Sequence, residues 1–108
     1  MELMTKEIEA RAQAQYPLGS SFDQMVVAKF FDPTGSYAWY LMNQDPADPD
    51  YLWGIGDRYA VECGSFSLAK LRTYRGPLGI GIERDKLFKP EPARVIWERL
   101  LARMGATA

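Results

Sequence analysis

Apolar residues near the end of this chain recur every three or four positions. They are Ala93, Ile96, Trp97, Leu100, Leu101 and Met104. This spacing predicts an amphipathic helix that buries one face. Pro92 suits the first helical position of such a helix, and Gly105 can end its last turn.

The middle of the chain is rich in β-branched and aromatic residues, which is typical of strands. Residues 25–31 (MVVAKFF) and 36–42 (SYAWYLM) flank the turn residues 32–35 (DPTG), and together they predict a hairpin. Residues 43–50 (NQDPADPD) predict an acidic loop, because two prolines oppose regular pairing. Residues 51–56 predict a third strand, and residues 58–62 predict a fourth strand or an edge.

Two further helices are predicted from their capping residues. Thr5 can cap a helix that runs to about Gln15, before Pro17 and Gly19 stop it. Gly64 is expected to bend the chain, and Ser67 can cap a short helix from Leu68 to about Thr73. The pattern therefore predicts an α+β fold: a small antiparallel sheet of three to five strands, packed by an N-terminal helix, a short middle helix and an amphipathic C-terminal helix.

Length, charge and cysteine content narrow the class of protein. With 108 residues, 47% of them apolar, residues 1–108 are expected to form a single domain. Thirteen basic and fourteen acidic side chains leave a formal charge of −1, so binding to nucleic acid or an anionic membrane would need a local patch. A lone cysteine, no leader sequence and no membrane-spanning run favour a cytoplasmic protein that does not enter a membrane.

The chain contains no histidine, which removes the commonest general base and nearly every zinc site. Cys63 has no obvious activating partner and is interpreted as a small buried hydrophobe. We therefore assign no catalytic residue, no metal and no cofactor, and a non-enzymatic protein is favoured over an enzyme.

The segment from Arg75 to Asp85 has the least ordinary composition, with three glycines and a proline in its first seven residues. It is expected to begin as a turn and to end extended. Its glycine spacing lacks the lysine of a phosphate-binding loop, so a structural turn is favoured. In an extended second half, Glu83 and Asp85 would share one face and, with Glu62, could hold Mg²⁺, as a metal-dependent nuclease or phosphoryl-transfer enzyme requires. Ion pairs are the favoured interpretation of these charges.

The strand region offers two other candidate sites. The acidic residues Asp45, Asp48 and Asp50 lack the spacing of a calcium loop and are interpreted as a solvated turn. A third function, single-stranded nucleic-acid binding, would use stacking aromatics and two cations: Tyr37, Trp39, Tyr40, Tyr51, Trp53, Lys29 and Arg58. Alternation places Tyr37, Trp39 and Leu41 on one side of their strand and Ala38, Tyr40 and Met42 on the other. If both rows are core, helices should cover both faces; a bare row would mark a binding site.

Several short motifs carry a family resemblance: Phe66-Ser-Leu68, Arg75-Gly-Pro-Leu-Gly79 and Ile82-Glu-Arg-Asp85, with Val27-Ala-Lys-Phe-Phe31 and Trp39-Tyr40 upstream. Through them the chain resembles, over nearly its whole length, a family of small bacterial proteins of unknown function. Members of that family are often encoded on plasmids, integrated elements and phages. The resemblance implies an accessory role in transfer, replication or contest with host defences, and it implies no mechanism.

Elimination and the unusual segment lead to one leading hypothesis: a non-enzymatic binding protein of a mobile genetic element, whose partner is an unidentified protein. The binding surface is predicted to contain Arg75, Gly76, Glu83, Arg84, Asp85, Trp39 and Trp53. The metal-dependent enzyme and the single-strand binder remain as alternatives.

Overall fold

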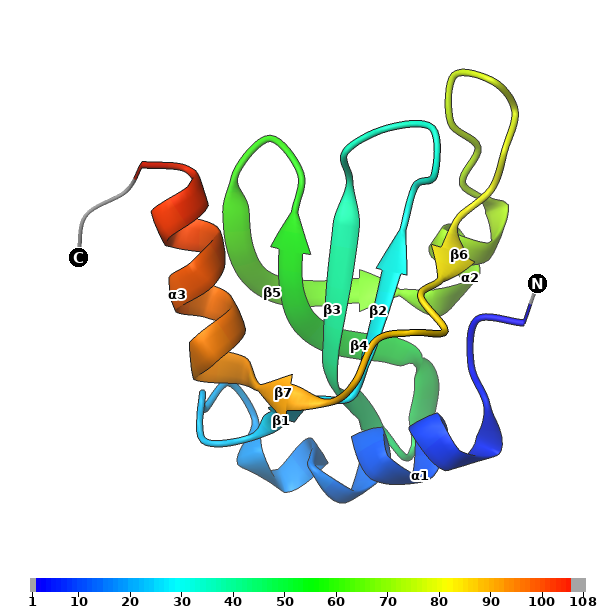
Figure 1. The fold of residues 1–108 in the computed structure, drawn as a ribbon. Helices are drawn as coiled ribbons and strands as arrows, with labels where there is room; N and C mark the ends of the chain where they lie inside the picture. The colour runs from blue at the N-terminus through cyan, green and yellow to red at the C-terminus, as the bar shows by residue number, and fades with distance from the viewer. Residues whose placement is uncertain (1, 106–108) are drawn as a thin grey trace.

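Five strands form one antiparallel sheet in the order β5-β4-β3-β2-β6, as the computed structural model of residues 2–105 shows (Figure 1). The strands are β2 (Ala28–Phe31), β3 (Ala38–Asp45), β4 (Asp48–Asp57), β5 (Val61–Ser67) and β6 (Glu83–Arg84). A second, two-stranded pair joins β1 (Met25–Val26) to β7 (Glu91–Pro92).

Three α-helices and one short 3-10 helix complete the fold: α1 (Lys6–Ala14), η1 (Tyr16–Leu18), α2 (Leu68–Thr73) and α3 (Ala93–Arg103). The predicted caps are confirmed. The Thr5 hydroxyl accepts the Ile8 N–H at 3.1 Å and the Ser67 hydroxyl accepts the Lys70 N–H at 3.2 Å, so each satisfies a backbone donor at a helix start. Gly105 follows α3 with a φ of 75°, a conformation that suits glycine.

Both faces of the sheet are covered, because alternate residues of β3 enter different cores. Trp39 and Leu41 belong to a core packed by α1 and α2, whereas Tyr40 and Met42 belong to a core packed by α3. The predicted α+β fold, with one helix near each end of the chain and a short one between, is therefore confirmed.

The predicted loop over residues 43–50 is wrong. Asn43 and its two successors continue β3, β4 begins at Asp48, and only Pro46 and Ala47 form the turn. The ladder shifts register between Gln44 and Asp45, which gives Pro49 a place without a ladder hydrogen bond. The Gln44 side-chain amide donates to the Pro49 carbonyl at 2.7 Å and ties this irregular part of the hairpin together.

Gly64 lies inside β5, opposite Gly54 of β4, and the pairing of the strand continues through it. The chain does curve along β5, as Figure 1 shows, without a break in the strand. The turn before it spans only residues 58–60, so the fourth strand begins at Val61, near the end of the predicted range. A glycine inside a strand pairs like any other residue when its backbone is extended.

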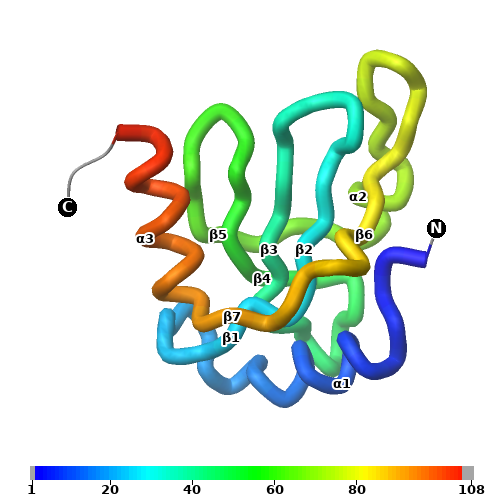
Figure 2. The backbone as a smooth tube through the Cα atoms, viewed as in Figure 1, coloured from blue at the N-terminus to red at the C-terminus, as the bar shows by residue number. Residues whose placement is uncertain are grey.

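The long strands β4 and β5 curl behind β2 and β3 and lead into α2 (Figures 1 and 2). The β2–β3 turn, the β4–β5 turn and the loop of residues 75–82 lie together at one end of the molecule, while α1 lies at the other (Figure 2). Within residues 2–105, no helix has the length and apolar character needed to cross a membrane.

Candidate functional site

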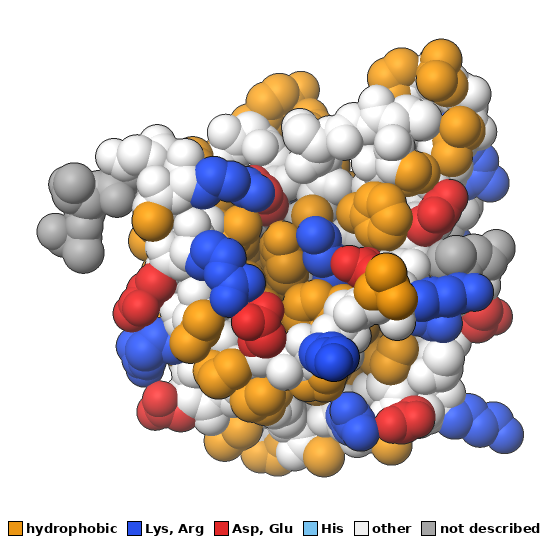
Figure 3. All heavy atoms as spheres, in the orientation of Figure 1, with side chains coloured by type: hydrophobic (Ala, Val, Ile, Leu, Met, Phe, Trp, Pro, Cys, Tyr) orange, Lys and Arg blue, Asp and Glu red, His pale blue; other side chains and the backbone are white. Residues whose placement is uncertain are grey.

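The loop that follows α2 is a small, well-bonded hairpin. Arg75 and Gly81 form a bridge, the Gly76 N–H donates to the Ile80 carbonyl at 3.0 Å, and the Gly79 N–H donates to the Gly76 carbonyl at 2.9 Å. Gly79 has a φ of 74°, which explains a glycine at this position. The loop tip exposes 76% of Leu78. Apolar side chains gather over this loop, at the upper right of Figure 3.

Gly76 fits against the β2–β3 turn. A Cβ on it would lie 2.5 Å from the Thr34 hydroxyl and 3.0 Å from both carboxylate oxygens of Asp32. The buried Asp32 carboxylate accepts the Thr34 N–H at 2.9 Å, the Thr34 hydroxyl at 2.8 Å and the Tyr74 hydroxyl at 3.0 Å. These bonds, the Thr34 N–H foremost, hold the pKa of Asp32 below its usual value. Gly76 therefore joins the loop to the turn.

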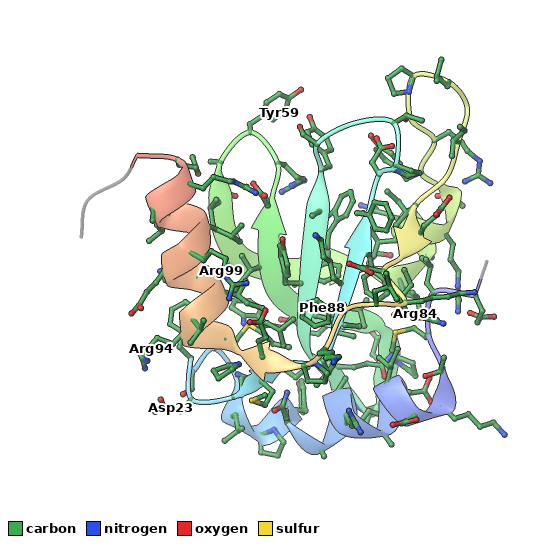
Figure 4. All side chains as sticks on the ribbon, in the orientation of Figure 1. Asp23, Tyr59, Arg84, Phe88, Arg94 and Arg99 are labelled. Atoms are coloured by element: carbon green, nitrogen blue, oxygen red, sulfur yellow. The ribbon has the colours of Figure 1, made fainter. Side chains whose placement is uncertain are left out.

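The charged residues of the same segment contact other parts of the domain. Arg75 donates to the carbonyls of Arg72 and Tyr74 at the end of α2. Arg84 donates to the carbonyls of Glu2 and Leu3, and Figure 4 shows its side chain reaching toward the N-terminal segment. The Asp85 carboxylate accepts the Leu87 N–H at 2.9 Å within its own turn. These three side chains therefore diverge to separate contacts.

The carboxylates of the suggested Mg²⁺ site do not meet. Glu83 lies on β6 opposite Phe31, while Glu62 lies on β5, at the other edge of the sheet. Three strands, β4, β3 and β2, lie between these two edges. Residues 2–105 contain no cluster of three or more acidic, cysteine or histidine ligands.

Asp50, from the acidic stretch, has a defined contact of its own. Its carboxylate accepts the Ala69 N–H at 2.7 Å and the Ser67 hydroxyl at 2.8 Å, at the start of α2. These two bonds, that of Ala69 first, lower the pKa of Asp50. Asp50 thereby fixes α2 to the beginning of β4.

The two tryptophans predicted to share a surface lie on opposite faces of the sheet. Trp39 belongs to the core beside α1 and α2, and Trp53 packs against the core beside α3. The Trp53 indole N–H is buried and bonds to no group among the described residues. Tyr40 is also on the α3 side. The Lys29 ammonium lies 5.5 Å from its ring centre, and the ring centre of Phe88 lies 6.5 Å from it.

A groove lies between α2 and the curled sheet, and we call it the α2 groove. It consists of one hollow of about 520 Å³ and a second of about 150 Å³ that share Trp39, Arg58, Ser65 and Phe66. The first is completed by Tyr37, Asp48, Asp50, Tyr51, Ser67, Lys70, Leu71 and Tyr74, and the second by Gly56, Glu62, Cys63 and Gly64.

Aromatic rings in edge contact line one side of the α2 groove. Ring centres lie 6.3 Å apart between Tyr37 and Trp39, and 6.0 Å apart between Trp39 and Tyr74. Tyr37 also contacts Tyr59, whose side chain is 94% exposed and points away from the β4–β5 turn (Figure 4). Rings held against one another offer a preformed apolar surface with little conformational freedom to lose on binding.

Two glycines, Gly56 of β4 and Gly64 of β5, line the smaller hollow. Gly56 lies opposite Trp39, and Gly54, beneath the groove, lies opposite Leu41. At Gly54 a Cβ would lie 1.9 Å from the Tyr40 carbonyl oxygen, so packing requires glycine there. At Gly64 a Cβ would meet nothing within 4 Å. Packing within the described chain therefore does not explain Gly64.

Charges of both signs border the α2 groove. Arg58 and Lys70 are its cations, and neither makes an ion pair with a described residue. Asp48, Asp50 and Glu62 are its carboxylates. Burial raises the pKa of the Cys63 thiol, which favours its protonated form. This surface is suited to binding, with apolar contacts at the centre and polar groups at the rim.

Sequence reasoning found part of this groove. Of the predicted binding surface, the structure places only Trp39 there. Residues from the other hypotheses also line the groove: Tyr37, Tyr51 and Arg58 from the single-strand one, Glu62 from the metal one, and Asp48 and Asp50 from the acidic stretch. Phe66, Lys70, Tyr74 and the open glycine Gly64 were missed. The signal that could have pointed to them is the pairing of Gly54 with Gly64, and it depends on strand register.

Comparison with known proteins gives a family and no function. A family model described as a protein of unknown function (DUF2958) matches residues 2–107. No curated protein matches the chain. No solved structure matches it either.

Proposed function

Because the chain belongs to the DUF2958 family, whose function is unknown, we propose from its site that it is a non-enzymatic binding protein that takes a segment of a protein partner into the α2 groove. The observation that carries this proposal is the open groove itself, which has aromatic walls and a glycine, Gly64, that internal packing does not require.

The size and lining of the groove favour a side chain or short segment as its ligand. Its larger hollow, about 520 Å³, lies within the range of about 300–1,000 Å³ typical of ligand pockets. Trp39 and Tyr74 support each other at its wall, so the apolar surface exists before the ligand arrives. Aromatic anchors in preformed pockets dominate the energetics of many protein interfaces.

Charge argues against single-stranded nucleic acid as the ligand. The two hollows carry three carboxylates against two cations, and a phosphate backbone would approach all of them. Single-strand binders need a positively charged groove beside their stacking rings. Affinity for oligonucleotides that falls steeply with added salt would reverse this choice.

The biological setting of the proposal comes from the family resemblance. An accessory role in transfer, replication or contest with host defences can be carried out by binding a protein of the element or of its host. A groove that binds a protein segment fits that role, and the partner is expected in the cytoplasm.

The test uses the purified chain and a random-peptide display library. Peptides enriched on the wild-type protein are measured against Gly64→Val, which fills the groove at a position where an added Cβ has free space. The matched control is Ala102→Val, which adds two methyl groups to an exposed position of α3, a helix on the other face of the sheet. Circular dichroism and urea unfolding establish that both variants fold.

We expect peptides whose binding is lost in Gly64→Val and kept in Ala102→Val. Failure to enrich any peptide, or equal binding by both folded variants, would contradict the proposed function. Selected peptides that bind elsewhere, for example at the exposed Leu78 loop, would likewise reject the α2 groove.

A further inference from the structure

The α2 groove follows the edge of β5 and not only its face. Six consecutive residues, 62–67, line its two hollows. Side chains of a strand alternate between faces, so a cavity against one face is lined by every second residue. Lining by consecutive residues means that the backbone itself borders the groove.

The outer edge of β5 is unpaired. β5 is the terminal strand of the five-stranded sheet, and its seven residues bond only to β4 among the described elements. In an antiparallel edge strand, every second residue directs its N–H and C=O groups away from the sheet. Sheet edges are commonly protected by proline, by charged side chains, especially lysine, or by a covering element. The sequence VECGSFS contains no proline or lysine, and its one charged residue, Glu62, lies near the start of the strand.

Gly64 lies in the middle of this edge, where glycine weakens a strand and leaves space. A glycine inside a strand often marks the close approach of another backbone. No atom lies within 4 Å of the Cβ position of Gly64, so another backbone has room to come close there.

Building on the proposed function, we propose that the ligand is an extended segment of the protein partner that adds to the sheet as a sixth strand along residues 62–67 of β5. The main chain of the segment bonds to the open backbone of β5. Its alternate side chains face the α2 groove, where an apolar one packs beside Trp39 and Phe66. This is recognition by strand addition, in which main-chain bonds give affinity and pockets give sequence preference.

Charge adds one feature to the expected ligand. Arg58 lines both hollows and makes no ion pair with a described residue. An acidic side chain of the segment, next to its apolar one, would pair with Arg58. The preferred segment is thus extended, with an apolar and an acidic residue facing the groove.

A second copy of the chain explains the groove less well. If two β5 strands paired with each other, the strand added beside each groove would be VECGSFS, whose central Cys-Gly-Ser brings only small side chains to fill the 520 Å³ hollow. Self-association of the purified chain through β5, detected by light scattering and abolished by a proline in β5, would overturn the assignment to a partner segment.

The probe for strand addition is the tightest peptide from the display selection, synthesised with one N-methyl group at each position in turn. N-methylation removes a single backbone donor and leaves the side chains in place. We expect methylation at alternate positions to weaken binding, by roughly tenfold per lost bond, and methylation between them to have little effect. Binding that tolerates every single N-methyl group while still failing in Gly64→Val would reject strand addition and leave the proposed function intact.

Amide hydrogen exchange of the protein gives an independent readout. In the free chain, alternate amides of β5 should exchange fast, because only every second one bonds to β4. The peptide should slow the fast set. Unchanged exchange of those amides in the saturated complex would overturn the inference, and an Arg58→Gln variant should lose its preference for an acidic residue in the peptide.

Discussion

Two glycine-to-alanine substitutions should change stability in opposite directions. In Gly76→Ala, the new methyl group would lie 2.5 Å from the Thr34 hydroxyl and 3.0 Å from the Asp32 carboxylate. Thr34 cannot move away without losing its 2.8 Å bond to that carboxylate. In Gly64→Ala, the methyl group meets no atom within 4 Å.

The magnitudes follow from the contacts. Overpacking costs about 1–3 kcal/mol of stability, and weakening a hydrogen bond to a charged group adds to that cost. Replacing glycine by alanine has the opposite effect and stabilises the fold by up to about 1 kcal/mol. Gly76→Ala should therefore lower the free energy of unfolding by about 2 kcal/mol. Gly64→Ala should raise it by about 0.5–1 kcal/mol, because glycine is a poor strand residue.

Urea unfolding followed by tryptophan fluorescence measures both changes. With a slope of about 2 kcal/mol per molar urea, Gly76→Ala should move the midpoint down by about 1 M. Equal shifts in the two variants, or a more stable Gly76→Ala, would show that Gly76 does not join the loop to the β2–β3 turn as described.

Three further predictions concern the contacts that hold the fold. Ser67→Ala removes the α2 cap and a partner of Asp50, and should cost about 1 kcal/mol in urea unfolding; no loss would contradict the capping role. The lowered pKa of Asp32 means that, between this value and the unfolded value of about 3.9, the unfolded chain binds more protons. The free energy of unfolding should therefore fall as the pH drops through this window, and it should fall less steeply in Asp32→Asn. An equal dependence on pH in the variant and the wild type would show that Asp32 is not the group responsible. Arg84→Met removes the donors to the carbonyls of Glu2 and Leu3, and should speed amide exchange around these residues without unfolding the sheet. Unchanged exchange there would argue that the N-terminal segment is held by other contacts.

Local chemistry predicted the helices and the first hairpin. Thr5 and Ser67 are caps in the structure because a hydroxyl at the helix start has a backbone donor to satisfy, whatever the rest of the chain does. The turn at residues 32–35 and the alternation in β3 were likewise readable, since both depend on neighbouring residues alone.

Errors arose where pairing partners decide the outcome. Pro49 is tolerated in β4 because the ladder shifts register beside it. This compensation is not visible in the residue itself. The same limit applies to the site: the sequence placed Trp39 and Trp53 on one surface, whereas strand register separates them to opposite faces.

The segment from Arg75 to Asp85 shows how a conspicuous motif can be explained by contacts within the fold. Its glycines and charges meet the β2–β3 turn, the end of α2 and the N-terminal segment. Their part in binding stays a prediction, which alanine variants that fold normally can test. The groove, by contrast, is formed by residues that are ordinary in sequence and distinctive only in their arrangement.

The most direct test of the α2 groove is chemical-shift mapping by NMR, with the tightest selected peptide titrated into the isotope-labelled chain. We predict that the largest amide changes fall on residues 62–67 of β5 and that the Trp39 indole signal moves with them. Changes confined to the α3 face, to the Leu78 loop or to no site at all would contradict a binding groove between α2 and the sheet.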